Sequence, residues 1–134
     1  MSKRYTILGI PRPQSRPRFA RIGKFVKTYE RKEDTHYKEN VSAQLVAQKP
    51  TFLTGAVSVR AIFHLPRPKA LPKKILHHVK KPDVDNLIKG LMDACKGILW
   101  KDDTQVVELT AIKIYGEPPK VEMEVGELLG GKKD

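Results

Sequence analysis

Ten prolines limit the length of every regular element in this 134-residue chain. Proline fixes φ, has no amide hydrogen and pushes the preceding residue out of the α region, so helices stop near it and central strands exclude it. Prolines cluster at 11–17 and 66–82, and further breaks fall at Pro50, Pro118 and Pro119. Between these breaks only strands and helices of moderate length fit, and apolar periodicity decides between the two.

The apolar pattern between the prolines predicts two principal helices, about four main strands and a hairpin. The strands are predicted at 5–10, 56–65, 105–115 and 120–128, the hairpin around Gly23 at 18–27, and the helices at 34–48 and 87–99. Phase slips in 105–115 indicate a β-bulge. This order is typical of a single mixed α/β (α+β) domain over 1–134, with both helices packed on a mixed β-sheet and a frayed tail at 130–134.

The charge of the chain restricts its partners. It has 26 Lys and Arg against 15 Asp and Glu, a formal net charge of +11. This excess favours a polyanion, with nucleic acid ahead of an anionic membrane surface. A soluble basic protein with solvated faces is the competing interpretation.

The sequence also predicts a cytoplasmic protein that does not enter a membrane. It has no run of 18 apolar residues, and its first residues lack the apolar core of a signal peptide. Cys95 is the single cysteine and cannot form an internal disulfide, which agrees with a reducing compartment. Because Cys95 falls on the apolar face of helix 87–99, we expect it in the core rather than as a nucleophile.

Basic side chains gather where they can reach the phosphates of DNA. They lie in the proline-rich loop after the first strand, in the predicted hairpin, and directly before an acidic cluster: Arg12, Arg16, Arg18, Lys24, Lys80 and Lys81. A solvated basic loop is the alternative for the first group. The linker 66–81 is also basic and proline-rich, and the sequence predicts an irregular path for it.

Two acidic clusters flank the second helix of this otherwise basic chain. Asp83 and Asp85 precede it, and Asp102 and Asp103 follow it. If three of these carboxylates converge, they form an oxygen-rich site for a hard divalent cation such as Mg²⁺, with Lys89 on the same helix face as Asp85. A helix of ~13 residues is about 20 Å long, so convergence requires the following strand to begin beside Asp83. Otherwise the aspartates are helix caps and a polar turn.

The two clusters lie in a paired motif. Residues 83–89 read Asp-Val-Asp-Asn-Leu-Ile-Lys, and residues 100–106 read Trp-Lys-Asp-Asp-Thr-Gln-Val. The pair, D-x-D-N-x-x-K and then W-x-D-D-x-Q-V after a helix, resembles the RusA family of Holliday junction resolvases. Either half alone is a weak signal, and the two halves with the right gap are specific. The linker 66–81 looks longer than the basic lead-in associated with that family.

The resemblance implies a homodimeric, Mg²⁺-dependent endodeoxyribonuclease, with Mn²⁺ as a substitute metal, that resolves four-way DNA junctions by paired nicks in recombination and repair. It assigns Asp83, Asp85 and Asp103 as catalytic metal ligands, Lys89 as the catalytic lysine and Asp102 as an accessory acid. It also suggests a phage or prophage setting. Two alternatives remain open from the residues: a non-catalytic nucleic-acid-binding module, and a metal nuclease that acts on other branched DNA such as flaps or forks.

Overall fold

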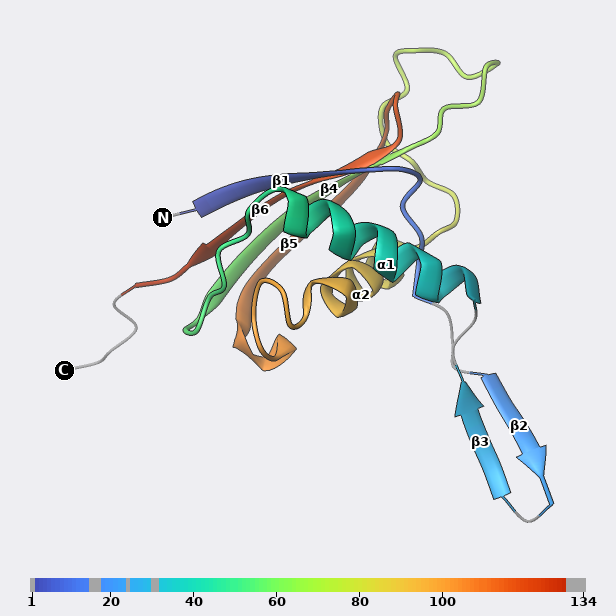
Figure 1. Cartoon of the computed structure of the whole chain (residues 1–134). Helices are drawn as coiled ribbons and strands as arrows, with labels where there is room; N and C mark the ends of the chain where they lie inside the picture. Colours follow the sequence, from blue (N-terminus) through green and yellow to red (C-terminus); the bar gives the residue numbers. More distant parts are fainter. Residues whose placement is uncertain (1, 15–17, 24, 30–31, 130–134) are drawn as a thin grey trace.

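The computed structural model of the chain describes residues 2–14, 18–23, 25–29 and 32–129. Its elements, in order, are β1 (Ser2–Leu8), β2 (Arg18–Ile22), β3 (Phe25–Tyr29), α1 (Lys32–Ala47), β4 (Val57–Leu65), α2 (Val84–Cys95), the short 3₁₀ helix η1 (Asp103–Gln105), β5 (Val106–Tyr115) and β6 (Lys120–Glu127). The predicted α+β class, with a mixed four-stranded sheet, a hairpin and two helices, is confirmed (Figure 1).

The main sheet has the strand order β1-β6-β4-β5. β6 runs antiparallel to both of its neighbours, whereas β4 and β5 are parallel and are joined through α2. A parallel pair needs a crossover connection, and the long segment from Leu65 to Val106 supplies it. β2 and β3 form a separate two-stranded sheet, as the predicted hairpin requires.

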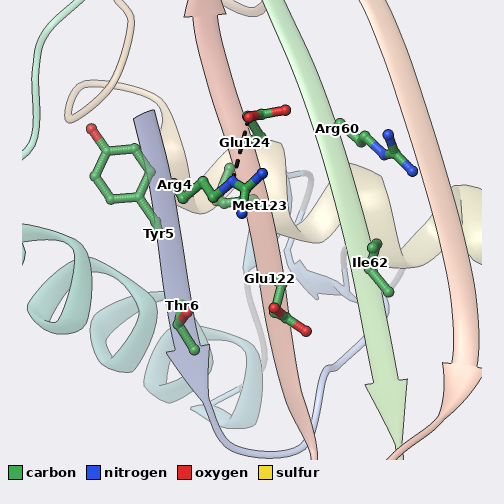
Figure 2. A pocket seen from close by; sticks show the side chains of 8 residues that line it. All are labelled: Arg4, Tyr5, Thr6, Arg60, Ile62, Glu122, Met123 and Glu124. Carbon is green, nitrogen blue, oxygen red and sulfur yellow. Dashed lines mark hydrogen bonds and ion pairs between the residues drawn. The ribbon is translucent and has the colours of Figure 1, made fainter. Parts of the chain in front are cut away.

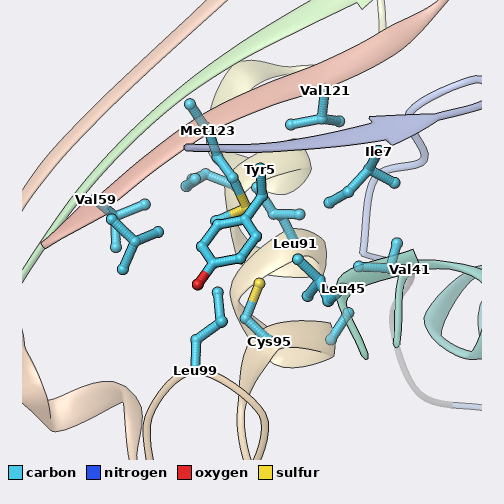
Figure 3. Close-up of a cluster of buried hydrophobic side chains, with 14 of the residues drawn as sticks. Tyr5, Ile7, Val41, Leu45, Val59, Leu91, Cys95, Leu99, Val121 and Met123 are labelled. Carbon is cyan, nitrogen blue, oxygen red and sulfur yellow. The ribbon is translucent and has the colours of Figure 1, made fainter. Parts of the chain in front are cut away.

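Both helices cover the same face of the main sheet, and the core lies between them and the strands (Figure 3). The alternating pattern of β4 places five of its side chains in this core: Val57, Val59, Ala61, Phe63 and Leu65. α1 contributes Val41 and Leu45, and α2 contributes an apolar stripe that includes Leu87, Leu91 and Cys95. Cys95 is fully buried, which confirms its predicted place in the core. Burial, with a smaller contribution from the charge of Asp103, raises the pKa of its thiol and so disfavours the reactive thiolate.

The two departures from ideal elements have local causes. Val57 pairs with Val106 and Ser58 with Glu108, so Val107 has no partner on β4 and the predicted bulge is confirmed. α2 ends at Cys95 rather than at Leu99. Gly97 takes a left-handed φ of 86°, and its amide donates to the carbonyl of Trp100 at 2.7 Å.

The outer edge of β1 is sealed by side chains of α1. Gln44 accepts from the amide of Leu8 at 2.7 Å and donates to its carbonyl at 2.8 Å. Gln48 does the same for Thr6, at 3.0 and 2.7 Å. These four bonds satisfy backbone groups that an added strand would otherwise use, so this edge is closed to further pairing at Thr6 and Leu8.

The face of the sheet away from the helices carries charges of both signs (Figure 2). Arg4 and Arg60 lie there with Glu122 and Glu124, and Arg4 Nε is 3.5 Å from Glu124 Oε2. Such a mixed surface is a poor match for a polyanion. None of the helices that the structure describes is both long enough and apolar enough to cross a bilayer.

Candidate active site

The first acidic cluster lies at the amino end of α2. Asp83 occupies the N-cap position in an extended conformation, and its carbonyl accepts from the amide of Leu87 at 3.1 Å. Its carboxylate makes no capping hydrogen bond. Asp85 follows in the first turn, and both side chains are exposed. Within the described residues, neither carboxylate has a hydrogen-bond or ion-pair partner, so both are available to a ligand.

A lysine from the sheet holds the chain just before this cluster. Lys113 of β5 donates to the carbonyls of Lys80 and Pro82, at 2.5 and 2.8 Å. A charged donor shared by two carbonyls is a strong restraint. The sequence analysis missed Lys113, which is half-buried in the structure. The signal that could have found it is a lysine placed between Ile112 and Ile114 in an otherwise apolar strand.

The proline-rich loop after β1 packs on the same end of α2. The amide of Gln14 donates to the carbonyl of Asn86 at 2.9 Å. Gly90 makes the close approach possible, because a Cβ there would lie 3.1 Å from the carbonyl oxygen of Arg12. The guanidinium of Arg12 reaches Asp34 of α1 at 3.3 Å. Arg12 therefore ties the loop to α1 as well as being a candidate phosphate contact.

The second acidic cluster is built differently. Asp102 accepts from the amide of Thr104 at 3.2 Å, and Gln105 accepts from the amide of Asp102 at 3.0 Å, which completes a capping box on η1. Asp103 is half-buried and accepts from the indole nitrogen of Trp100 at 2.8 Å. Both carboxylates of this cluster are therefore engaged in local structure.

The two clusters lie at opposite ends of α2 and of β5. α2 has 12 residues, so it is about 18 Å long. Asp103 begins η1, which leads directly into the start of β5. Lys113, near the end of β5, contacts Pro82, and the strand from Val106 to Lys113 spans roughly 23 Å. Among the residues that the structure describes, no three His, Cys, Asp or Glu side chains form a group that could hold a metal ion. One chain therefore does not bring Asp103 to Asp83 and Asp85.

Lys89 lies one turn after Asp85 and is exposed. Within the described residues, the ammonium of Lys89 forms no ion pair. The next residue on that helix face, Asp93, forms an ion pair with Lys38 of α1 instead. Lys89 therefore stays free beside the first cluster. Lys80 and Lys81 are exposed immediately before Asp83. Arg16 and Lys24 lie outside the described residues, as does the side chain of Arg18.

A groove of about 640 Å³ runs beside the first cluster. Its lining includes the apolar residues Ile10, Pro11 and Leu65 and the polar residues Asp83 and Asn86. The groove leaves the Asp83 carboxylate accessible from outside the protein.

A family comparison covers both clusters. Residues 9–126 match the model of the family described as "Endodeoxyribonuclease RusA". The chain belongs to the RusA family. The resemblance seen in the paired motif is thereby confirmed, because residues 83–106 lie within the matched region.

Two relatives align along nearly the whole chain. "Uncharacterized protein YqaN" of Bacillus subtilis (strain 168) is 35% identical over 137 residues, covering 93% of this chain and 96% of YqaN. "Crossover junction endodeoxyribonuclease rusA" of Lactococcus phage r1t is 25% identical over 131 residues, covering 89% of this chain and 92% of the phage protein. The name of the phage protein specifies crossover junctions, whereas the family description states only an endodeoxyribonuclease.

A divalent cation fits part of the RusA-family motif in this chain. Mg²⁺ is usually held by one or two protein carboxylates, with water and phosphate oxygens as its other ligands. The exposed, unpaired Asp83 and Asp85 satisfy that requirement. A site with all three motif carboxylates does not fit within a single chain, because the length of α2 separates Asp103 from the other two.

Proposed function

We propose that this protein is a Mg²⁺-dependent endodeoxyribonuclease that resolves four-way DNA junctions by paired nicks, in recombination and repair. The observation that carries the proposal is the pair of exposed carboxylates, Asp83 and Asp85, at an anchored helix start in a RusA-family chain. The name of the phage relative, a crossover junction endodeoxyribonuclease, supports junctions as the substrate class.

The cation would be held by Asp83 and Asp85 of one subunit, with Asp103 of a second subunit as a third ligand and Mn²⁺ as a substitute metal. Bound there, it would lower the pKa of a water molecule and neutralise charge on the phosphate. Lys89 would place its ammonium beside the same phosphate and stabilise negative charge as it develops. Asp102, which caps η1, would act on Asp103 only through the backbone that they share.

Basic residues would hold the strand at this site. Lys80 and Lys81 are exposed directly before Asp83, where their ammonium groups can pair with flanking phosphates. Arg12, Arg16, Arg18 and Lys24 are the further candidates from the loop and hairpin before α1. Binding through several phosphates would make the affinity for DNA fall steeply with salt.

A homodimer would serve this function in two ways. Paired cuts need two sites, and a two-fold axis relates them most simply. The same axis can supply the missing ligand. If the β5 strands of two copies meet antiparallel, the start of one strand, next to Asp103, lies beside the end of the other, which Lys113 ties to the segment before Asp83.

The proposal is tested with Asp85→Asn on a synthetic four-way junction. We expect nicking in Mg²⁺ to fall at least about a hundredfold, while binding without metal is retained or tightens because a negative charge near phosphate is lost. Asp93→Asn is the matched control, since it removes the same charge from α2 at a residue paired with Lys38. Full activity in Asp85→Asn would refute the proposed site.

The competing functions predict different results. A non-catalytic binding module would use its aspartates as caps, an arrangement seen for Asp102 but not for the Asp83 side chain. Such a module would show no rise in melting temperature with Mg²⁺ or Mn²⁺, whereas a metal site must be stabilised by its ligand. A nuclease for flaps or forks would cut those substrates in preference to four-way junctions in the same panel.

A further inference from the structure

The segment 66–81, between β4 and α2, is the most cationic part of the described chain and leads into the site. It carries Arg67, Lys69, Lys73, Lys74, Lys80 and Lys81 and no acidic residue. All five lysines are exposed, and within the described residues none of their ammonium groups has a hydrogen-bond or ion-pair partner. In Figure 1 this segment, coloured yellow-green, extends beyond the end of the sheet. We refer to residues 66–81 as the basic loop.

Internal hydrogen bonds give the basic loop a defined shape. The amide of Leu71 donates to the carbonyl of Pro68 at 3.0 Å, and the amide of Ile75 to that of Pro72 at 3.1 Å, which makes two successive turns. The guanidinium of Arg67 also donates to Pro72 at 2.8 Å. Arg67 therefore acts inside the loop, and the exposed lysines lie on a braced backbone.

Both stems of the loop are attached to the sheet. At the first stem, the amide of Arg67 donates to Glu117 at 3.0 Å and its guanidinium lies 5.2 Å from the ring centroid of Tyr115. At the second, the amide of Tyr115 donates to the carbonyl of Leu76 at 2.9 Å, and Lys113 holds the carbonyl of Lys80. A loop held at both ends loses little conformational entropy when it binds a partner.

We propose that the basic loop is a preformed contact for the phosphate backbone of a DNA duplex arm next to the cut strand. The inference rests on the proposed function and extends it to residues outside the RusA motif. Lysine is a flexible point charge suited to phosphate, and residues 69–74 hold no Arg, Asn or Gln to read base edges. The loop would therefore add affinity without sequence preference, from a segment that ends two residues before Asp83.

The test compares two double variants that remove the same charge. Lys73→Ala with Lys74→Ala alters the loop. The control pairs Lys49→Ala with Arg60→Ala: Lys49 is an exposed residue just after α1, whose carbonyl accepts from Lys3 at the start of β1, and Arg60 lies on the mixed-charge face of the sheet. Binding to a four-way junction is measured without metal at several salt concentrations. The loop variant should bind at least about fivefold more weakly at 0.1 M salt, and its slope of log K against log salt should fall by up to about 1.8. The affinity of the control variant should stay within about twofold of that of the unaltered protein. The two double variants should have equal melting temperatures.

An unchanged slope in the loop variant would overturn the inference while leaving a binding-competent nuclease intact. Wild-type protein that binds junctions but does not nick them would instead refute the proposed function and leave the loop result standing. Vesicles with anionic lipid form a third arm: if the loop variant loses vesicle binding but keeps its DNA slope, the loop contacts membranes and the inference is wrong.

A single substitution tests whether the loop is preformed. Glu117→Ala removes the acceptor for Arg67 but keeps every lysine, and it also makes the protein more positive. Charge alone would tighten binding to DNA, whereas a loosened loop would weaken it. We expect weaker binding, by about two- to fivefold, with an unchanged salt slope. Tighter binding would show that the loop needs no bracing by the sheet.

Discussion

The two ends of α2 carry the same residue type and use it for different purposes. At the amino end, Asp83 and Asp85 are exposed and make no side-chain bond within the described part of the chain. At the carboxyl end, Asp102 caps η1 and Asp103 accepts from the buried Trp100. An aspartate that satisfies backbone amides adds stability, whereas a pair left unsatisfied adds none and is open to a ligand. The comparison indicates which acids serve the fold and which are available for chemistry.

The largest effect on nicking is expected when the amino-end and carboxyl-end aspartates of α2 are replaced in separate chains and the chains are then mixed. Asp85→Asn and Asp103→Asn should each abolish nicking alone. If the ends meet across a dimer, mixing the two variants restores one intact site in every mixed dimer. We expect about one quarter of wild-type activity, as single rather than paired nicks, in a junction-cleavage assay after subunit exchange.

The control for this experiment mixes two variants altered at the same end. Asp83→Asn with Asp85→Asn leaves every possible site defective, so the mixture should remain inactive. Restoration there would point to an artefact of exchange. No restoration with Asp85→Asn and Asp103→Asn would refute a site shared between subunits.

The next effect concerns the lysine that anchors the amino end. Lys113→Met keeps the length of the side chain but removes the donor to Lys80 and Pro82. The Mg²⁺ concentration for half-maximal nicking should rise about tenfold, because residues that orient metal ligands typically contribute that much to affinity. Lys113→Arg should recover part of the loss. A lower rate with an unchanged Mg²⁺ dependence would show that Lys113 does not position the site.

For the free energy of unfolding, substitutions at the carboxyl end of α2 should have the larger effect, and those at the amino end the smaller. Asp102→Ala breaks the capping box and should lower the free energy of unfolding by about 1 kcal/mol. Asp83→Asn removes no capping bond and should change it by less than about 0.5 kcal/mol. Urea denaturation at neutral pH measures both. Equal losses would mean that the Asp83 carboxylate also supports the fold.

The smallest effect concerns pH near the amino end. Burial lowers the pKa of His78 below its usual 6.5, and the nearby positive charges of Lys113 and Lys80 act in the same direction. The unfolded chain therefore binds a proton more readily, and stability falls as the pH drops below 6.5 towards the folded pKa. His78→Phe keeps a ring against Tyr115 and should flatten this dependence in thermal melts from pH 7 to 5. An unchanged profile would assign the pH dependence to other groups.

Periodicity predicted most of the fold because the elements are amphipathic. The alternation in β4 and the stripe on α2 are local properties, and both were located correctly. The end of α2 was predicted too late because Leu99 is buried in a turn and so continues the helical apolar pattern. A left-handed glycine, Gly97, changes the backbone without changing that pattern.

The separation of the acidic clusters could not be read from spacing, because it depends on the direction of β5. The chain leaves β4 at its carboxyl end, where Asp83 lies, and α2 then runs back along the sheet. A strand parallel to β4 must begin at the other end, and Asp103 lies at that beginning. Had β5 been antiparallel to β4, the same sequence spacing would have placed Asp103 near Asp83. The anchoring by Lys113 was missed for the same reason, since it joins residues more than 30 positions apart.

The hydrogen bonds from Gln44 and Gln48 to the edge of β1 limit how many copies of the protein can assemble through their sheets. A sheet with two free edges can add copies indefinitely and form fibres, whereas a sheet with one free edge stops at two. Gln44 and Gln48 occupy the β1 edge at Thr6 and Leu8. The other outer strand, β5, is covered at its end, where His77 bridges to Ile114, and the rest of its outer edge faces no strand in the described part of the chain. Replacing both glutamines with alanine would therefore alter more than the packing of α1: it would give the protein a second docking edge, and with it the means to polymerise.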